Sequence, residues 1–161
     1  MDRIWAPWRI KYVSQKRPKG CILCKAYRER KDKKNFVIFR SRYCFAIFNT
    51  FPYNNGHIMI VSNRHVGSLE RLKDPELLDM NKTLVKMKSI LKKILKPHGF
   101  NIGINIGKPA GAGINNHIHM HLVPRWLGDT NFMPVLSNTK MISQSLNELY
   151  IKFRKQLNAK V

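Results

Sequence analysis

The stretch HIHMHLV, residues 117–123, sets three histidines in strict alternation with apolar residues. Such alternation predicts a β-strand, because successive side chains of a strand point to opposite faces of a sheet. We therefore expect the imidazoles of His117, His119 and His121 on one face, about 6.6 Å apart, with the apolar side chains in the core. Half of the chain's six histidines lie here, so a chance cluster is a poor explanation.

A row of imidazoles on one strand face is suited to two kinds of chemistry. Histidine transfers protons near neutral pH, and its imidazole can also act as a nucleophile toward phosphorus. Neighbouring histidines on one face can alternatively chelate a single metal ion. The pattern alone leaves both hypotheses open.

Short β-type runs and two amphipathic patterns surround this strand. Asp74 and Pro75 have the residue types of a helix N-cap and first position, and Gly99 is a typical helix terminator. Links between the runs are mostly too short for parallel crossovers, which favours an antiparallel α+β fold. We expect a sheet of about five strands over residues 36–39, 43–48, 57–62, 100–106 and 117–123, a long helix over 75–97 and a C-terminal helix over 142–157.

The length and the net charge of the chain limit the classes of protein to which it can belong. The chain has 161 residues, which suits one domain, and its 30 Lys and Arg against 9 Asp and Glu give a net charge of +21. This charge predicts attraction to a polyanion: an acidic ligand, nucleic acid or a membrane surface. No secretory signal or spanning apolar segment is recognisable, and three cysteines are too few for a disulfide framework. We expect a cytoplasmic protein with reduced thiols and no place in the membrane.

A glycine-rich loop precedes the histidine strand and favours a phosphate ligand. Gly107, Gly111 and Gly113 would let the backbone approach a ligand closely. The loop lacks the spacing of a Walker motif, and it is followed by a strand rather than the helix of a dinucleotide site. Between Asp79 and Asp129 all eight charged residues are Lys or Arg, which suits a polyphosphate.

Cys21 and Cys24 form a C-x-x-C pair whose meaning is open from its spacing alone. A redox pair, half of a zinc site and coincidence are all compatible with it. The strand-helix-strand setting that a redox pair prefers is not evident here. Cys44 is expected as a small core residue, and His98 as a partner for a helix C-terminus.

Taken together, these motifs resemble the histidine triad (HIT) superfamily, whose defining motif is His-φ-His-φ-His-φ-φ. Asn49 with PYNNGHIMIV, residues 52–61, resembles the family's N…P-x-x-x-G-H segment, and residues 105–111 resemble its phosphate loop. A narrower resemblance, to bacterial diadenosine tetraphosphate hydrolases or phosphorylases, is carried by WAPWRIKY near the start, PRW at 124–126 and GDTNFMPV at 128–135.

The resemblance implies nucleotidyl transfer in which His119 attacks the α-phosphate. His117 would orient His119 through the backbone and lie near His57, and His121 would contact the phosphate and the leaving group. Many relatives carry a hydroxyl in the A-G-Q-[ST] part of the loop, which is missing here, so we expect Asn115 or Asn116 to substitute. The implied nucleotide and phosphate contacts are Asn49, Asn105, Gly107, Gly111, Gly113 and Asn115.

The resemblance also implies cofactors, partners and a division of the chain. Many bacterial members hold a structural zinc, for which this chain offers Cys21, Cys24, His65 and His117. We expect Mg²⁺ to accompany the polyphosphate substrate, and the protein to form a homodimer. The residues themselves, dense in Lys and Arg with Pro7 disfavouring an early helix, predict an extended basic arm over 1–34 that carries the C-x-x-C pair, which leaves residues 35–161 as the HIT domain.

The leading hypothesis is an enzyme that cleaves dinucleoside polyphosphates, or related nucleoside phosphate derivatives, through a covalent nucleotidyl-His119 intermediate. The charge keeps a second hypothesis open, a nucleic-acid-associated HIT protein that acts on adenylated DNA or RNA ends. A metal-dependent enzyme that uses the triad as ligands is the third. A basic RNA-associated scaffold without activity is the fourth.

Overall fold

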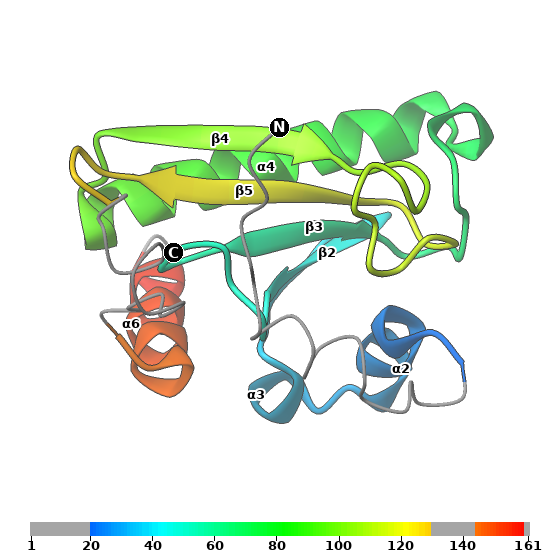
Figure 1. Ribbon diagram of the computed structural model, residues 1–161. Helices are drawn as coiled ribbons and strands as arrows, with labels where there is room; N and C mark the ends of the chain where they lie inside the picture. The colour runs from blue at the N-terminus through cyan, green and yellow to red at the C-terminus, as the bar shows by residue number, and fades with distance from the viewer. Residues whose placement is uncertain (1–19, 130–143, 160–161) are drawn as a thin grey trace, which may run out of the picture.

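Five antiparallel strands form one sheet in the order β1-β2-β3-β5-β4. The computed structural model describes residues 20–129 and 144–159, so the expectations for the front WAPWRIKY segment and for residues 130–135 lie outside it. Figure 1 shows β4 at one edge, followed by β5, β3 and β2. The strands are β1 Val37–Arg40, β2 Cys44–Phe48, β3 Ile58–Ser62, β4 Gly99–Ile104 and β5 His119–Arg125. The predicted antiparallel α+β class is confirmed.

Helices cover both faces of this sheet and give it two apolar clusters. On one face Ile58, Ile60 and Leu122 pack with apolar residues of α4 and α6. On the other face Met59 and Val61 pack with residues of α2. The helices are α2 Ile22–Glu29, α3 Asp32–Asn35, α4 Asp74–Leu95 and α6 Leu146–Asn158, with a short 3-10 turn, η1, over Leu69–Arg71.

Helices α2 and α3 correct the prediction of an extended arm for the part of residues 1–34 that the structure describes. Leu23 and Ala26 lie three positions apart on one side of α2, and both are buried against the sheet. This i, i+3 apolar pair defines a helix face that the dense Lys and Arg pattern obscures in the sequence.

The long helix and the histidine strand begin or end at other residues than predicted. Lys73 is the N-cap of α4 and donates its amide to Glu76 Oε2 at 2.8 Å, so Asp74 is the first helical residue. The helix ends at Leu95, because Pro97 cannot continue it, and Gly99 instead begins β4. Strand β5 begins at His119, two residues later than expected.

Gly56, in the turn before β3, is the position where an added methyl group should destabilise the fold most clearly. Its φ is +76°, and a Cβ would lie 2.6 Å from Leu95 Cδ1 and 3.2 Å from Pro124 Cγ. Left-handed strain and overpacking together predict that Gly56→Ala lowers the free energy of unfolding by about 2–4 kcal/mol. Urea denaturation measures this. Gly99→Ala, whose Cβ would meet nothing within 4 Å, is the control, and equal losses in both variants would contradict the prediction.

Candidate active site and metal cluster

The triad histidines lie on the α2 side of the sheet. In the antiparallel register His119 pairs with Val61 and His121 with Met59, which both belong to the apolar cluster under α2. The two imidazole rings are 5.0 Å apart, and both residues are buried. His117 is buried too but precedes the strand, because the following amide, that of Ile118, bonds to Val66 O instead of a strand partner.

The backbone fixes the tautomer of His119. Its Nδ1 lies 2.8 Å from the carbonyl oxygen of His117. A carbonyl can only accept a hydrogen bond, so Nδ1 carries the proton and Nε2 keeps its lone pair. Burial lowers the pKa of His119, and this keeps the ring neutral near pH 7. The arrangement is the one that a nucleophilic imidazole needs.

A chain of hydrogen bonds fixes the tautomers of His57 and His121. The Tyr53 amide donates to His57 Nδ1 at 3.1 Å, so the proton of a neutral His57 is on Nε2. This Nε2–H donates to His121 Nδ1 at 2.9 Å. The proton of a neutral His121 is therefore on its own Nε2, which is buried and without a hydrogen-bond partner among the described residues. A buried donor left in this state suits a bound acceptor such as a phosphate oxygen.

The position of His57 corrects one expectation. His57 lies beside His121 and not near His117. The cause is the register of β3 and β5, in which Ile58 pairs with Leu122. His57 therefore meets the far end of the triad, while the last residue of β3, Ser62, faces His117.

The predicted phosphate contacts lie in the loop that joins β4 to β5 and in the loop after β2. Gly107 and Gly111 have positive φ, and a Cβ at Gly111 would lie 3.6 Å from Asn105 Nδ2. Gly113 and Asn115 follow in the same loop, and Asn115 Oδ1 is buried without a partner among the described residues. Asn49 instead donates its Nδ2 to His57 Nδ1 at 3.3 Å and accepts from the Phe51 amide.

Tyr53 is a site residue that sequence reasoning missed. Its ring lies 4.6 Å from the His57 ring and stacks at 5.5 Å on the His121 ring, while 49% of the residue stays exposed. Tyr53 falls on an unspecified position of the P-x-x-x-G-H pattern. Only its place four residues before His57, in a turn closed by Gly56, could have pointed to it.

Cys21, Cys24, His65 and His117 converge on one point, with their ligand atoms all within 4.8 Å of one another. His65 Nδ1 and His117 Nδ1 are 3.3 Å apart, and Cys24 Sγ lies 3.3 and 3.4 Å from these two nitrogens. Usual zinc bond lengths and a tetrahedral angle predict about 3.3 Å between two nitrogens and about 3.6 Å between nitrogen and sulfur.

The tautomer of His117 fits this cluster. Its Nε2 lies 2.7 Å from the carbonyl oxygen of Ser62, so Nε2 carries the proton and Nδ1 presents a lone pair to the cluster. A ligating histidine ordinarily has such an outer hydrogen bond. The donor set and its spacing are thus compatible with zinc. Within residues 20–129 and 144–159, this is the one group of three or more His, Cys, Asp or Glu side chains arranged to hold a metal ion.

Burial of His121 predicts a loss of stability in acid. Desolvation, and next the neighbouring His119, lower the pKa of His121 from 6.5 to about 4. As the pH falls from 6.5 to about 4, His121 takes up a proton in the unfolded chain but stays neutral in the folded chain. The free energy of unfolding should therefore drop, in total on the order of 3 kcal/mol, and level off below the folded pKa.

The measurement is urea denaturation between pH 7 and pH 4 of the wild type and His121→Gln. The metal cluster is the same in both proteins, so the difference between their pH slopes belongs to His121. Parallel slopes in the two proteins would contradict the prediction.

Comparisons with known proteins show the family of this chain. Residues 30–126 match the HIT domain family. A Mycobacterium tuberculosis protein named AP-4-A phosphorylase is 35% identical over 156 residues, which cover 92% of this chain and 80% of that protein. The chain belongs to the HIT family.

Two further proteins extend the comparison. The bis(5'-nucleosyl)-tetraphosphatase (asymmetrical) of Schizosaccharomyces pombe is 31% identical over 93 residues, or 58% of this chain and 50% of that protein. A Zn-bound histidine triad family protein from Mycobacterium smegmatis superposes with a TM-score of 0.70 at 22% identity, covering 88% of this chain and 95% of that one. The first of these supports the class of activity and the second the fold. This chain is a HIT-family enzyme of the hydrolase or phosphorylase type.

Proposed function

We propose that this enzyme cleaves dinucleoside polyphosphates through a covalent nucleotidyl-His119 intermediate. The observation that carries the proposal is the hydrogen bond from His119 Nδ1–H to the His117 carbonyl, which leaves a neutral, buried Nε2 as nucleophile. The names of the Mycobacterium tuberculosis and Schizosaccharomyces pombe relatives support the substrate class.

In the proposed reaction, the Nε2 lone pair of His119 attacks the α-phosphorus, and the bond from phosphorus to the bridging oxygen breaks. The electron pair of that bond leaves with the departing polyphosphate. His121 Nε2–H donates a hydrogen bond to the oxygens on which charge gathers, and His57 holds His121 in the required tautomer. Water or inorganic phosphate then attacks the phosphorus, the bond from phosphorus to His119 Nε2 breaks, and its electron pair returns to Nε2. The proton that an attacking water releases passes to the solvent.

The glycine loop is proposed to hold the phosphates. Its backbone amides would stabilise the charge of the pentacoordinate phosphorus, an electrostatic contribution of a few kcal/mol per donor, roughly 10²-fold or more. Asn115 lies in this loop, and its side-chain Nδ2 is a donor that can take the place of the missing hydroxyl. The proposed nucleotide contacts remain Asn49, Asn105, Gly107, Gly111, Gly113 and Asn115.

Zinc is proposed as a structural metal bound by Cys21, Cys24, His65 and His117. Bound there, zinc would supply a closed tetrahedral cross-link and no catalytic water. His117 would then connect the two centres: its side chain would be a zinc ligand and its carbonyl orients His119. Magnesium beside the polyphosphate stays a prediction, which no contact among the described residues supports.

We also propose a cytoplasmic homodimer. Strand β4 is an edge strand with Ile102 half exposed, and on α4 Leu78 and Val85 are exposed. An uncovered edge strand and apolar side chains favour pairing with a second copy. None of the helices in the described ranges is long and apolar enough to cross a membrane. The proposed division into an arm, 1–34, and a HIT domain, 35–161, is consistent with α2 packing as a separate cover on one sheet face.

The second candidate function, action on adenylated nucleic-acid ends, is favoured by one observation. All six lysines of the segment from Lys82 to Lys96 are exposed, and the segment has no acidic residue. Salt-dependent binding to random-sequence DNA would support this function. The hypothesis of a triad that ligates a catalytic metal is weakened at His121, because its Nδ1 accepts from His57 and its Nε2 carries the proton of the neutral ring, so neither nitrogen presents a lone pair.

Turnover of diadenosine tetraphosphate, with and without inorganic phosphate, tests the leading proposal. Chromatography should show ATP and AMP if water is the acceptor, or ATP and ADP if phosphate is. Absence of turnover under both conditions, with turnover of adenylated DNA, would favour the second candidate.

A further inference from the structure

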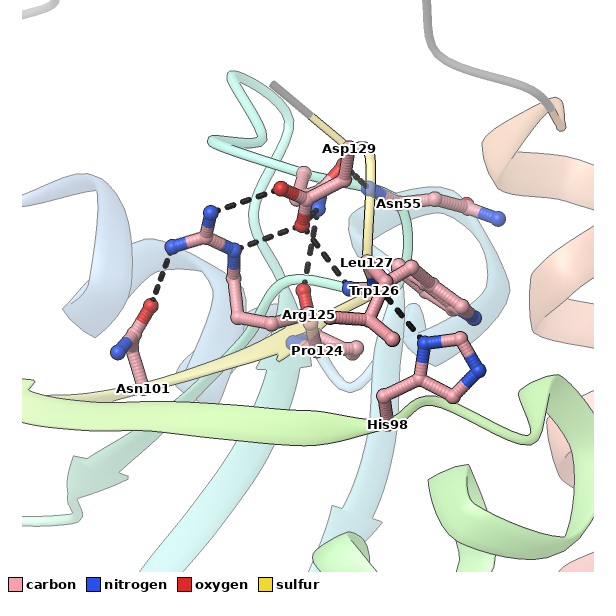
Figure 2. A network of polar contacts seen from close by, with 9 residues as sticks. Asn55, His98, Asn101, Pro124, Arg125, Trp126, Leu127 and Asp129 are labelled. Carbon is pink, nitrogen blue, oxygen red and sulfur yellow. Dashed lines mark hydrogen bonds and ion pairs between the residues drawn. The ribbon is translucent and has the colours of Figure 1, made fainter.

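Asp129 is the centre of a polar network at the end of the sheet away from the metal cluster. Its Oδ2 accepts three hydrogen bonds: from Arg125 Nε at 2.7 Å, from Asn54 Nδ2 at 2.7 Å and from the Trp126 amide at 3.1 Å. Its Oδ1 accepts a fourth, from Arg125 Nη2 at 2.7 Å. The side chain is only 10% exposed. Figure 2 shows Arg125 between this carboxylate and Asn101 of the edge strand β4. A buried carboxylate with so many donors is fixed in place.

Asn54 is the partner that links this network to the site. It is buried, and both of its amide hydrogens are used, one by Asp129 and one by Pro124 O at 3.1 Å. Its Oδ1 accepts from the Asn55 amide, and its backbone carbonyl accepts from the His57 amide. The side chain therefore has a single possible orientation, and the turn before His57 is held to β5.

The Tyr53 amide, next to Asn54 in the chain, is the nearer of two donors that set the tautomer of His57: it lies 3.1 Å from His57 Nδ1, against 3.3 Å for Asn49 Nδ2. If the turn shifted, Tyr53 N–H would leave His57 Nδ1, and only the longer bond from Asn49 Nδ2 would oppose a proton there, so the tautomer with the proton on Nδ1 would gain population. His57 Nε2 would then have no hydrogen for His121 Nδ1. The unpartnered donor of His121 would be lost from its place at the reacting phosphate.

We infer that Asp129 is a positioning residue for the triad, which acts through Asn54 and the Tyr53 amide to hold His57 and His121 in the tautomers that present a donor to the substrate. The inference rests on the proposed function for its kinetic consequence only. The tautomer of His57 is a property of the free protein and can be read without substrate.

The test uses the full chain and three variants. Asp129→Asn removes the charge, and Asn54→Ala cuts the link but leaves the pair of Asp129 and Arg125 intact. Asp32→Asn is the matched control, because Asp32 binds Arg40 through both of its oxygens at 2.7–3.2 Å but has no connection to His57. Nitrogen-15 spectra of the imidazoles report the tautomers, and kinetics with diadenosine tetraphosphate report kcat and KM.

We expect a mixture of His57 tautomers in both Asp129→Asn and Asn54→Ala, with kcat lower by about tenfold to 100-fold and KM within about twofold. Asp32→Asn should keep the wild-type tautomer and kcat. A wild-type His57 spectrum in Asn54→Ala, or equal effects in Asp32→Asn, would overturn the inference. A wild type without turnover would overturn the proposed function instead, while the spectra would still decide the positioning role. If Asp129→Asn does not fold, Asn54→Ala alone gives the answer.

Discussion

Replacing His119 by alanine should lower kcat by several orders of magnitude, on the order of 10⁴-fold, while nucleotide binding persists. The variant loses the atom placed as nucleophile, Nε2, whose lone pair is left free by the hydrogen bond from Nδ1–H to the His117 carbonyl. The binding loops are built from other residues, so the affinity for a nucleotide should change little. His119→Asn should behave in the same way.

Acid-quench mass spectrometry of the wild type with an adenylated substrate checks the chemistry directly. A covalent nucleotide is expected on His119 and on no other residue. His98→Ala is the matched control, because His98 is exposed and its Nδ1 accepts a hydrogen bond from the Leu127 amide, away from the triad. Its kcat should stay within about twofold of the wild type. Full activity in His119→Ala, or a label elsewhere, would refute the assignment.

Replacing Cys24 by serine should remove the metal and much of the stability together. The cluster connects α2 to the segments that flank β3 and β5, and binding free energy at a structural zinc site is also folding free energy. We expect a loss of more than about 3 kcal/mol, or roughly 10 °C in Tm for a chain of this size. Turnover should fall as well, because His117 would no longer be held by a ligand bond.

The measurement is elemental mass spectrometry of protein prepared without chelator, together with thermal unfolding. About one zinc per chain is expected in the wild type. Cys44→Ala is the control: Cys44 lies outside the cluster, and burial raises the pKa of its thiol to about 12, so it is inert. This variant should keep the metal. A wild type prepared in this way without zinc would contradict the assignment.

Local patterns predicted the strands well, and contacts between distant segments explain where the prediction was wrong. Short β-type runs located β2 and β3, and the alternation of histidines with apolar residues located β5, each within two residues. The start of β5 was misplaced because the Ile118 amide bonds to Val66 O, a contact that no local pattern reveals. Helix α2 was missed because a run of basic residues surrounds its two buried positions.

The candidate site, too, has some features that local patterns predict and others that depend on contacts between distant segments. The triad and its alternation could be read directly from residues 117–123, but the neighbour of His57 depends on the strand register, which local patterns do not give. The contact of Asn54 with Asp129 joins residues 75 positions apart. Both residue types are common in turns, so neither is conspicuous in the sequence. Their role follows only from the hydrogen bonds that they share.

The spacing of the metal cluster along the chain has a consequence for the order of folding. Cys24 is 41 positions from His65 and 93 from His117, so closing the cluster requires contacts of high sequence separation. His65 follows β3 and His117 precedes β5, so all four ligands meet only when those strands have paired and α2 has docked. Metal capture should therefore come after the rate-limiting barrier to folding. A metal bound there would slow unfolding far more than it speeds folding, and it would thereby raise the kinetic stability of the folded protein.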